Sequence, residues 1–256
     1  MKRLIPIVFS VLFACASSEH PDTPTPASDA VALAVAAPDR SDADRALDAG
    51  RKPAETFAFF RIAPGQHVAE LGAGGGYTSE LLARIVGPSG VVYGQNSQFI
   101  LDRFAAGPWG ERLAKPVNAN IQRLDTPFDA PFSAGFADAG KLDAVVNILF
   151  YHDTVWQGVD RAAMNRAVFA ALRSGGVYGI VDHSARPEDG TTVTDTLHRI
   201  DERAVVQEIT AAGFVLDAHA DFLRNPSDAR DWNDSPRAAA DKRGTSDRFV
   251  LRFIKP

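Results

Sequence analysis

Hydrophobic and polar positions alternate between two periods along most of the chain. Short apolar runs, typical of strands, stand at residues 67–71, 91–94, 120–124, 142–149 and 177–181. The stretches 78–86, 97–104 and 160–172 lie between them and carry apolar residues at helical spacing. The run at 142–149 is almost continuously apolar, as expected for a strand covered on both faces. This alternation predicts a doubly wound, mostly parallel α/β sheet.

The C-terminal part of the pattern is different. A helical stretch at 201–212 is followed by two apolar runs, 214–222 and 248–254, with only a loop between them. Two consecutive strands without a helix predict an antiparallel hairpin at one edge, which brings the sheet to seven strands. The loop at 224–247 is long for a hairpin and contains Trp232 and many aspartates. We expect this loop either to be functional or to pack over another part of the molecule.

The residues before the first strand predict two helices and a linker. Ser41 is a good N-cap for a helix over 42–49, and Pro53 fits the first turn of a second helix that runs to about residue 60. Residues 17–38 are rich in Pro, Ser, Asp, Thr and Ala. We therefore expect a flexible linker over residues 16–40 and one folded domain over residues 41–256.

The first fifteen residues predict export. A basic start at residues 1–3 precedes an apolar run, 4–13, that is too short to span a bilayer but fits the core of a signal peptide. The run ends in Leu-Phe-Ala-Cys at residues 12–15, which resembles a bacterial lipobox. In that type of signal the cysteine is lipidated, which implies an exported, periplasmic protein held on a bacterial membrane by Cys15. An ordinary secretory signal is the alternative.

Composition and charge exclude some classes of function. The chain has 45% hydrophobic and 23% charged residues, a formal net charge of −5 and scattered lysines and arginines. This is not the basic footprint of a nucleic-acid-binding protein, so no nucleic-acid partner is expected. The single cysteine excludes an intramolecular disulfide and a cysteine-based zinc site.

A glycine-rich turn is the strongest local signal. The strand at 67–71 ends in Glu70-Leu71, and Gly72, Gly74 and Gly76 follow before a helix. Glycines at these places let the main chain turn sharply and let a ligand press against it. The dinucleotide fingerprint needs another glycine where Tyr77 stands, so an NAD(P)-dependent reductase is disfavoured. A tight turn without a ligand is the alternative.

The spacing Glu-x-Gly-x-Gly-x-Gly resembles the first motif of class I S-adenosylmethionine (SAM)-dependent methyltransferases. Residues 142–147 and 172–182 resemble the fourth strand of that family and the turn into its fifth strand, and the resemblance extends over residues 41–256. The stretches 51–55 and 147–153 are similar to those of a set of bacterial predicted methyltransferases. The resemblance implies a Rossmann-like fold, SAM as the cofactor, and four residues that line it: Glu70, Gly72, Gly74 and Gly76.

Three further positions follow from the same resemblance. Asp125, after the third strand, is expected to bond the adenine amino group, and Asn147 ends the fourth strand beside the cofactor. At the end of the second strand the family usually has an acidic residue that accepts both ribose hydroxyls, whereas this chain has Gln95-Asn96. Asn96 is expected to contact the ribose without the strength of a charged acceptor. The prolines typical of amino-methylating enzymes do not follow Asn147.

Polar residues that follow the fourth and fifth strands form a candidate active site. Parallel strands bring these residues to one edge of the sheet, where a base and an orienting group could act on a methyl acceptor. We expect His152 or His183 to be the base and Tyr151 to orient an acceptor oxygen; helix capping and loop closure are the alternatives. Together, these side chains could instead hold a divalent metal: His152, Asp153, Asp182 and His183. No metal motif such as H-E-x-x-H is present, so we expect no metal.

The sequence thus favours SAM-dependent methyl transfer to a small molecule. The rival hypothesis is an exported, non-catalytic binding protein on the same fold. Gln95-Asn96 and export away from the cytoplasm, where SAM is made, suit the rival, and the complete glycine motif suits the enzyme. Arg51 and Lys52 are either solvated or lie near the cofactor or an anionic substrate.

Overall fold

The computed structural model describes residues 27–133, 136 and 142–256. The expected signal peptide at 1–15, its Cys15 and the linker residues up to 26 lie outside the described residues. Among the helices of the described part, none has the length and apolar character needed to cross a membrane.

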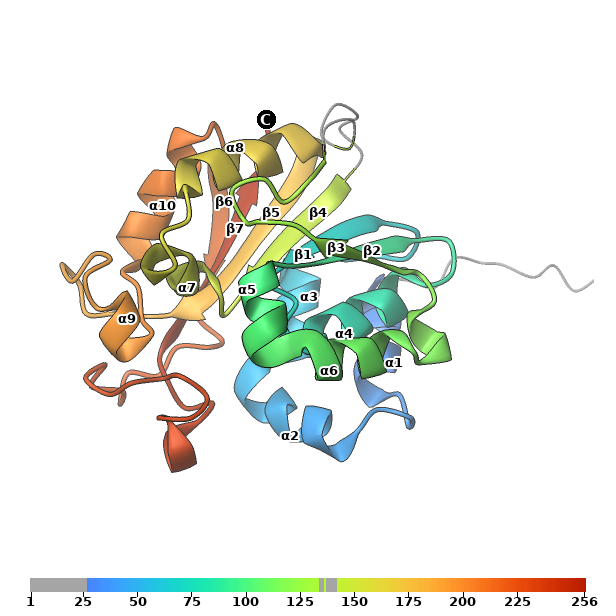
Figure 1. Ribbon diagram of the computed structural model, residues 1–256, viewed down its shortest axis with the longest axis horizontal. Coiled ribbons are helices and arrows are strands. Elements are labelled where there is room, and N and C mark those ends of the chain that lie inside the picture. The colour runs from blue at the N-terminus through green and yellow to red at the C-terminus, as the bar shows by residue number, and fades with distance from the viewer. Residues whose placement is uncertain (1–26, 134–135, 137–141) are drawn as a thin grey trace, which may run out of the picture.

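Seven strands form one sheet in the order β3-β2-β1-β4-β5-β7-β6 (Figure 1). The strands β1 to β5 run parallel, whereas β7 runs antiparallel to both of its neighbours. This confirms the doubly wound sheet with an antiparallel edge pair. Their bounds are β1 His67–Leu71, β2 Val91–Asn96, β3 Ile121–Asp125, β4 Leu142–Ile148, β5 Leu172–His183, β6 Val215–Ala220 and β7 Arg248–Ile254.

The chain leaves β1 in one direction towards β3 and then returns past β1 to β4. A crevice for a ligand is expected outside the carboxyl ends of the strands at such a switch point. The glycine turn follows β1, and the histidines predicted from the sequence follow β4 and end β5. The topology therefore brings both candidate motifs to the end of the sheet where the parallel strands have their carboxyl ends.

Helices cover both faces of the sheet (Figure 1). On one face lie α1, α3 and α4, and on the other lie α7, α8 and α10. The bounds are α1 Ala27–Ala36, α2 Asp42–Arg51, α3 Pro53–Phe59, α4 Tyr77–Val86, α5 Gln98–Ile100, η1 Leu101–Ala105, α6 Ala106–Leu113, η2 Pro116–Asn118, α7 Tyr151–Trp156, α8 Arg161–Ala171, α9 Thr194–Leu197, α10 Glu202–Ala211 and η4 Ala240–Lys242.

Strand alternation divides the apolar residues between two cores. Val68 and Val146 pack with Phe57 of α3 on one face of the sheet. Val145 packs with Met164 of α8 on the other face. Neighbouring residues of a strand point to opposite faces, so a strand buried on both sides needs an unbroken apolar run. This explains the pattern at residues 142–148.

Helix α1 corrects the predicted linker. Residues 27–36 form a helix whose Ala30, Val31 and Ala34 are buried against α3 and α4. The helix is followed by Arg40, whose guanidinium donates two bonds of 2.7 Å to the Asp48 carboxylate. The prediction of a linker is therefore wrong for residues 27–40, because the alanine- and valine-rich stretch has a core to pack against.

The start of β5 also differs from the expectation. The predicted helix to residue 172 ends instead at Ala171, and β5 begins at Leu172, which pairs with Leu142 of β4. The strand continues through Gly175, whose φ is 73°. Leu172 pairs with β4, so the chain leaves the helix at a position where the helical spacing alone would continue it. The caps predicted at Ser41 and Asp160 are present.

Candidate functional site

A large cleft opens at the carboxyl edge of the sheet, with a volume of about 1290 Å³. This exceeds the range of roughly 300–1,000 Å³ that is usual for sites of one drug-sized ligand, so two small molecules fit together. The glycine turn and α2 form one side of the cleft, α7 and α9 form another, and residues 234–248 of the β6–β7 connection close it.

The glycine turn has the conformation that its sequence requires. The φ angles of Gly72, Gly74 and Gly76 are 73°, 55° and 82°, in the left-handed region that favours glycine. A Cβ on Gly72 would lie 2.6 Å from the ring of Phe150, whereas a Cβ on Gly74 would meet no protein atom within 4 Å. Gly74 is thus the position where the main chain is open towards the cleft.

Three N–H groups of this turn, those of Gly72, Ala73 and Gly74, point to β2 and not to the cleft. Gly72 N donates to Gln95 Oε1 at 3.1 Å, and Gly74 N donates to Asn96 Oδ1 at 2.8 Å. Ala73 N donates to the Gln95 carbonyl oxygen at 2.9 Å. A phosphate cradle needs free N–H groups, so these bonds make the turn unsuitable for a pyrophosphate.

Glu70 gives this end of the cleft a titratable acid. It is 3% exposed and accepts a hydrogen bond from Ser79 Oγ. Burial raises the pKa of Glu70 to about 7, although hydrogen bonds from Ser79 and Thr78 oppose the rise. A cationic ligand beside this carboxyl would favour its ionised form.

Histidines and aspartates form a connected network on the other side of the cleft. The buried Asp182 carboxylate accepts from the backbone N–H of His152 and of His183, each at 2.8 Å. It also lies 2.7 Å from His152 Nδ1. On the other side of that ring, His152 Nε2 lies 3.2 Å from Asp153 Oδ1. Burial lowers the pKa of His152, but the charges of Asp182 and Asp153 outweigh it and raise the pKa to about 10.

His183 has the arrangement of a base held by a carboxylate. Its Nδ1 contacts Asp234 and lies 2.9 Å from Ser246 Oγ. Burial lowers the pKa of His183 to about 4, with Asp234 opposing and Arg248 assisting. The ring is therefore neutral at neutral pH. The Asp234 carboxylate beside Nδ1 favours the tautomer with the proton on Nδ1 and the lone pair on Nε2, on a ring that lines the cleft.

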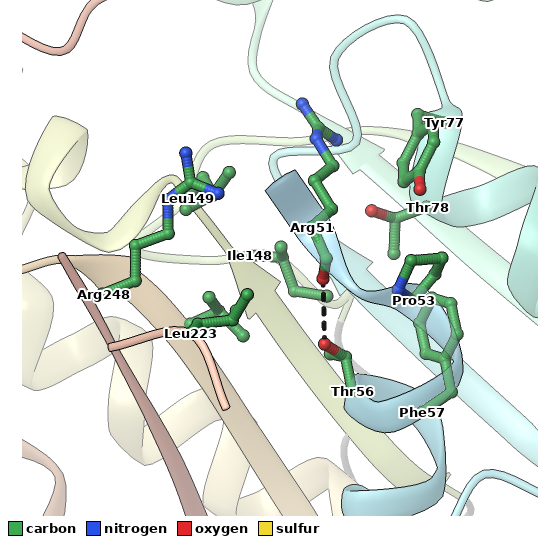
Figure 2. Close-up of a pocket in the computed structure, with 11 residues that line it drawn as sticks. Arg51, Pro53, Thr56, Phe57, Tyr77, Thr78, Ile148, Leu149, Leu223 and Arg248 are labelled. Atoms are coloured by element: carbon green, nitrogen blue, oxygen red, sulfur yellow. Dashed lines mark hydrogen bonds between the residues drawn. The ribbon is translucent and has the colours of Figure 1, made fainter. Parts of the chain in front are cut away.

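Two arginines lie between the glycine turn and the network of histidines and aspartates. Figure 2 shows Arg51 and Arg248 on opposite sides of Ile148 and Leu149. All four residues line a small cavity of about 10 Å³. The Arg51 guanidinium stacks on the Tyr77 ring at 4.5 Å, and Arg248 Nη1 donates to the Gly50 carbonyl oxygen at 2.5 Å. Among the described residues neither arginine forms an ion pair, so both are available to an anionic group in the cleft.

Solved structures similar to this chain include several methyltransferases and a cyclase. No family model matches the sequence. A SAM-dependent methyltransferase from Aquifex aeolicus superposes with a TM-score of 0.57 at 14% identity, over 79% of this chain and 88% of that chain. An S-adenosylmethionine-dependent methyltransferase from Mesorhizobium loti gives 0.55 at 18% identity, over 81% and 99%. The chain has a Rossmann-like methyltransferase fold.

The methyltransferase fold also supports other chemistry. The [4+2]-cyclase SpnF superposes with a TM-score of 0.54 at 18% identity, over 84% of this chain and 81% of that chain. The reaction of this chain therefore does not follow from the fold and depends on its own side chains.

The methyltransferase fold brings three of the predicted cofactor residues to the cleft, Glu70, Gly72 and Gly74. The other four do not line it. Gly76 is the N-cap of α4 and packs against Trp109. Asp125 is exposed and pairs with Arg123 at 2.7 Å, and its expected contact with adenine stays a prediction.

Asn96 and Asn147 are both fully buried. Both polar atoms of the Asn96 amide are bonded to Gly74. Its Oδ1 accepts from the Gly74 N–H at 2.8 Å, and its Nδ2 donates to the Gly74 carbonyl oxygen at 3.2 Å. This differs from the expected ribose contact. Asn147 lies behind the cleft wall, and neither atom of its amide has a hydrogen-bond partner within the described residues.

Of the predicted catalytic residues, His152 and His183 line the cleft and Tyr151 does not. Tyr151 is fully buried on the side of α8 and α10, where its hydroxyl donates to Glu208 and accepts from Asn165, each at 2.8 Å. The expectation that Tyr151 orients an acceptor is therefore wrong. The residue belongs to the core because its ring fills the space between three helices.

Sequence reasoning missed several residues of the site. Asp234, which lines the cleft, and Ser246, which does not, both contact His183 and come from the long β6–β7 connection. His198 also lines the cleft and ends α9 with a left-handed φ of 52°. The length and aspartate content of that connection were the available signal. Lys52, in contrast, donates to the Phe222 carbonyl oxygen at 2.7 Å and does not line the cleft.

Proposed function

We propose that this chain is a SAM-dependent methyltransferase that acts on a small-molecule acceptor. The observation that carries the proposal is the open main chain at Gly74 beside the buried Glu70. The N–H groups of Gly72 and Gly74 are bonded to Gln95 and Asn96, and the titratable group at this end of the cleft is the Glu70 carboxyl, which suits a sulfonium or an ammonium better than a phosphate.

Other polar groups of the cleft suit the binding of SAM and the removal of a proton from the acceptor. Arg51 lies on the same side as Glu70 and would bind the carboxylate of the methionine part of SAM. Methyl transfer needs donor and acceptor in line, together with a base where the acceptor loses a proton. His183, with its Nε2 lone pair, is the residue we assign to that base, and Asp234 holds its ring.

We also propose that the chain is exported and held on a bacterial membrane through Cys15. Support comes from the basic and apolar start and the Leu-Phe-Ala-Cys sequence at residues 12–15. Metabolic labelling with a fatty acid tests this, with Cys15→Ser as the control. Label on the parent chain and none on the variant is the expected result, whereas an unlabelled parent contradicts the anchor.

Calorimetry with SAM and with its demethylated product tests the enzyme proposal. The full chain is expected to bind both in the micromolar range typical of small cofactors. Gly74→Leu would place a side chain in the cleft without a clash with the protein, and should weaken binding at least tenfold.

Gly158→Leu is the matched control. Gly158 has a φ of 69°, no protein atom lies within 4 Å of an added Cβ, and the residue does not line the cleft. The same backbone strain without an obstruction should leave the affinity unchanged. Failure of the parent chain to bind either compound would contradict the proposal and favour a binding protein for another ligand.

A further inference from the structure

We propose that His152, Asp153 and His198 form a binding site for a divalent transition-metal ion at the edge of the cleft. One ligand atom from each residue lies within 4.8 Å of the other two. No sequence motif marks this site, because His198 comes from a different segment, 45 positions after Asp153. The site is distinct from the glycine turn and does not depend on SAM.

The distances between the ligand atoms suit a metal. Asp153 Oδ1 lies 3.2 Å from His152 Nε2 and 3.2 Å from His198 Nδ1. Zinc binds nitrogen and oxygen at about 2.0–2.2 Å, so two ligands in a tetrahedral site lie about 3.3 Å apart. The two observed separations are close to this value without any movement of the chain.

The hydrogen bonds around His152 leave a place for a cation. Asp182 accepts the hydrogen bond of the His152 Nδ1–H group at 2.7 Å, so Nε2 is the nitrogen of this ring that can bind a metal ion. Nε2 faces the Asp153 carboxylate, and His198 Nδ1 lies 3.2 Å from the same carboxylate oxygen. A single cation between these three atoms would be bound by all of them.

The surrounding residues have the features of a supported metal site. Metal-binding histidines commonly donate their second nitrogen to a carboxylate, as His152 does to the fully buried Asp182. Trp156 Nε1 donates to Asp153 Oδ1 at 2.7 Å and orients that carboxylate. All three ligand residues line the cleft, so the free positions of the ion face it. Two imidazoles and one carboxylate are a set that suits zinc or ferrous iron.

Titration with zinc chloride tests the site on the full chain after chelation and without SAM. One equivalent of zinc should bind per chain and raise the melting temperature. His198→Asn, whose new side chain tolerates the left-handed backbone, should weaken zinc binding at least tenfold. His219→Asn, at an exposed position on β6, should bind zinc as the parent does.

Asp182→Asn gives a second test, because losing this partner of His152 should weaken zinc binding about 10- to 100-fold. Circular dichroism checks that each variant is folded. Zinc binding by His198→Asn as tight as that of the parent would overturn the proposal, and so would a parent chain that binds no zinc. The second outcome would mean that a proton alone occupies the site, and it would leave the calorimetry with SAM unaffected.

Discussion

The side-chain amide of Asn96 forms two hydrogen bonds with the main chain of Gly74, one to its N–H at 2.8 Å and one from its Nδ2 to the carbonyl oxygen at 3.2 Å. Asn96 thus holds the glycine turn in place from β2, on the side away from the cleft. We expect Asn96→Asp, which restores the acidic residue usual in the methyltransferase family, to destabilise the protein by about 1–3 kcal/mol, because a buried carboxylate would face the Gly74 carbonyl oxygen.

Urea unfolding at neutral pH measures this cost. Gln207→Glu, the same change of an amide to an acid at an exposed position on α10, should lie within about 0.5 kcal/mol of the parent. Tighter SAM binding by Asn96→Asp, with stability unchanged, would show that this side chain reaches the ribose after all.

Glu70 predicts a pH dependence of SAM affinity. Its folded-state pKa is raised by burial to about 7, so the carboxyl is mostly neutral at pH 6 and mostly ionised at pH 8. If the cationic cofactor binds the ionised form, affinity should rise about tenfold between these pH values. Calorimetry at both pH values measures the change, and Glu70→Gln should flatten it. Equal affinity of the parent chain at pH 6 and pH 8 would contradict the role assigned to Glu70.

His183 predicts a loss of stability in mild acid. Its pKa is about 4 in the folded protein and about 6.5 in an unfolded chain, so the unfolded chain binds more protons between these values. The stability that the neutral ring contributes is present above pH 6.5 and is lost as pH falls towards 4. The parent should therefore lose up to roughly 3 kcal/mol more than His183→Asn between pH 7 and pH 4.

Unfolding free energies at several pH values measure that difference. His219→Asn changes an exposed histidine in the same way, and its profile should run parallel to that of the parent. Parallel profiles for His183→Asn and the parent would mean that His183 is not held in its neutral form.

Helix α1 predicts a strong contrast between two neighbouring positions. Val31 is 3% exposed and packs against the core, whereas Leu33 is 67% exposed. Val31→Ala should destabilise the protein by about 2 kcal/mol, because it removes two buried methyl groups and leaves a cavity. Leu33→Ala should change the stability by less than about 0.5 kcal/mol. Equal effects in thermal unfolding would mean that α1 does not pack on the domain in solution.

Local signals predicted the fold well. The apolar runs gave the seven strands, and the caps at Ser41 and Asp160 gave the starts of two helices. These signals work because period and capping depend on neighbouring residues only. Helix α1 was missed because its sequence is short and alanine-rich. Its helical structure depends on packing against α3 and α4, which the local sequence does not indicate.

The site was less predictable because its contacts join distant segments. His183 was found from its strand, but its partners Asp234 and Ser246 lie 51 and 63 positions further along the chain. Tyr151 and Asn96 were placed in the site because they follow strands, and the structure turns both side chains into the protein. Position at a strand end identifies the right edge of the sheet, but packing decides which side chains face the ligand.

The β6–β7 connection has a consequence for how such a protein changes over time. It joins the edge strand β6 to its neighbour β7, and it carries Asp234 and Arg237 to the cleft, while the glycine turn follows the more central strand β1. Insertions or replacements in this peripheral segment would reshape this wall of the cleft without disturbing the central strands. Under the proposed function, acceptor preference could therefore change while the glycine turn and its contacts stay the same.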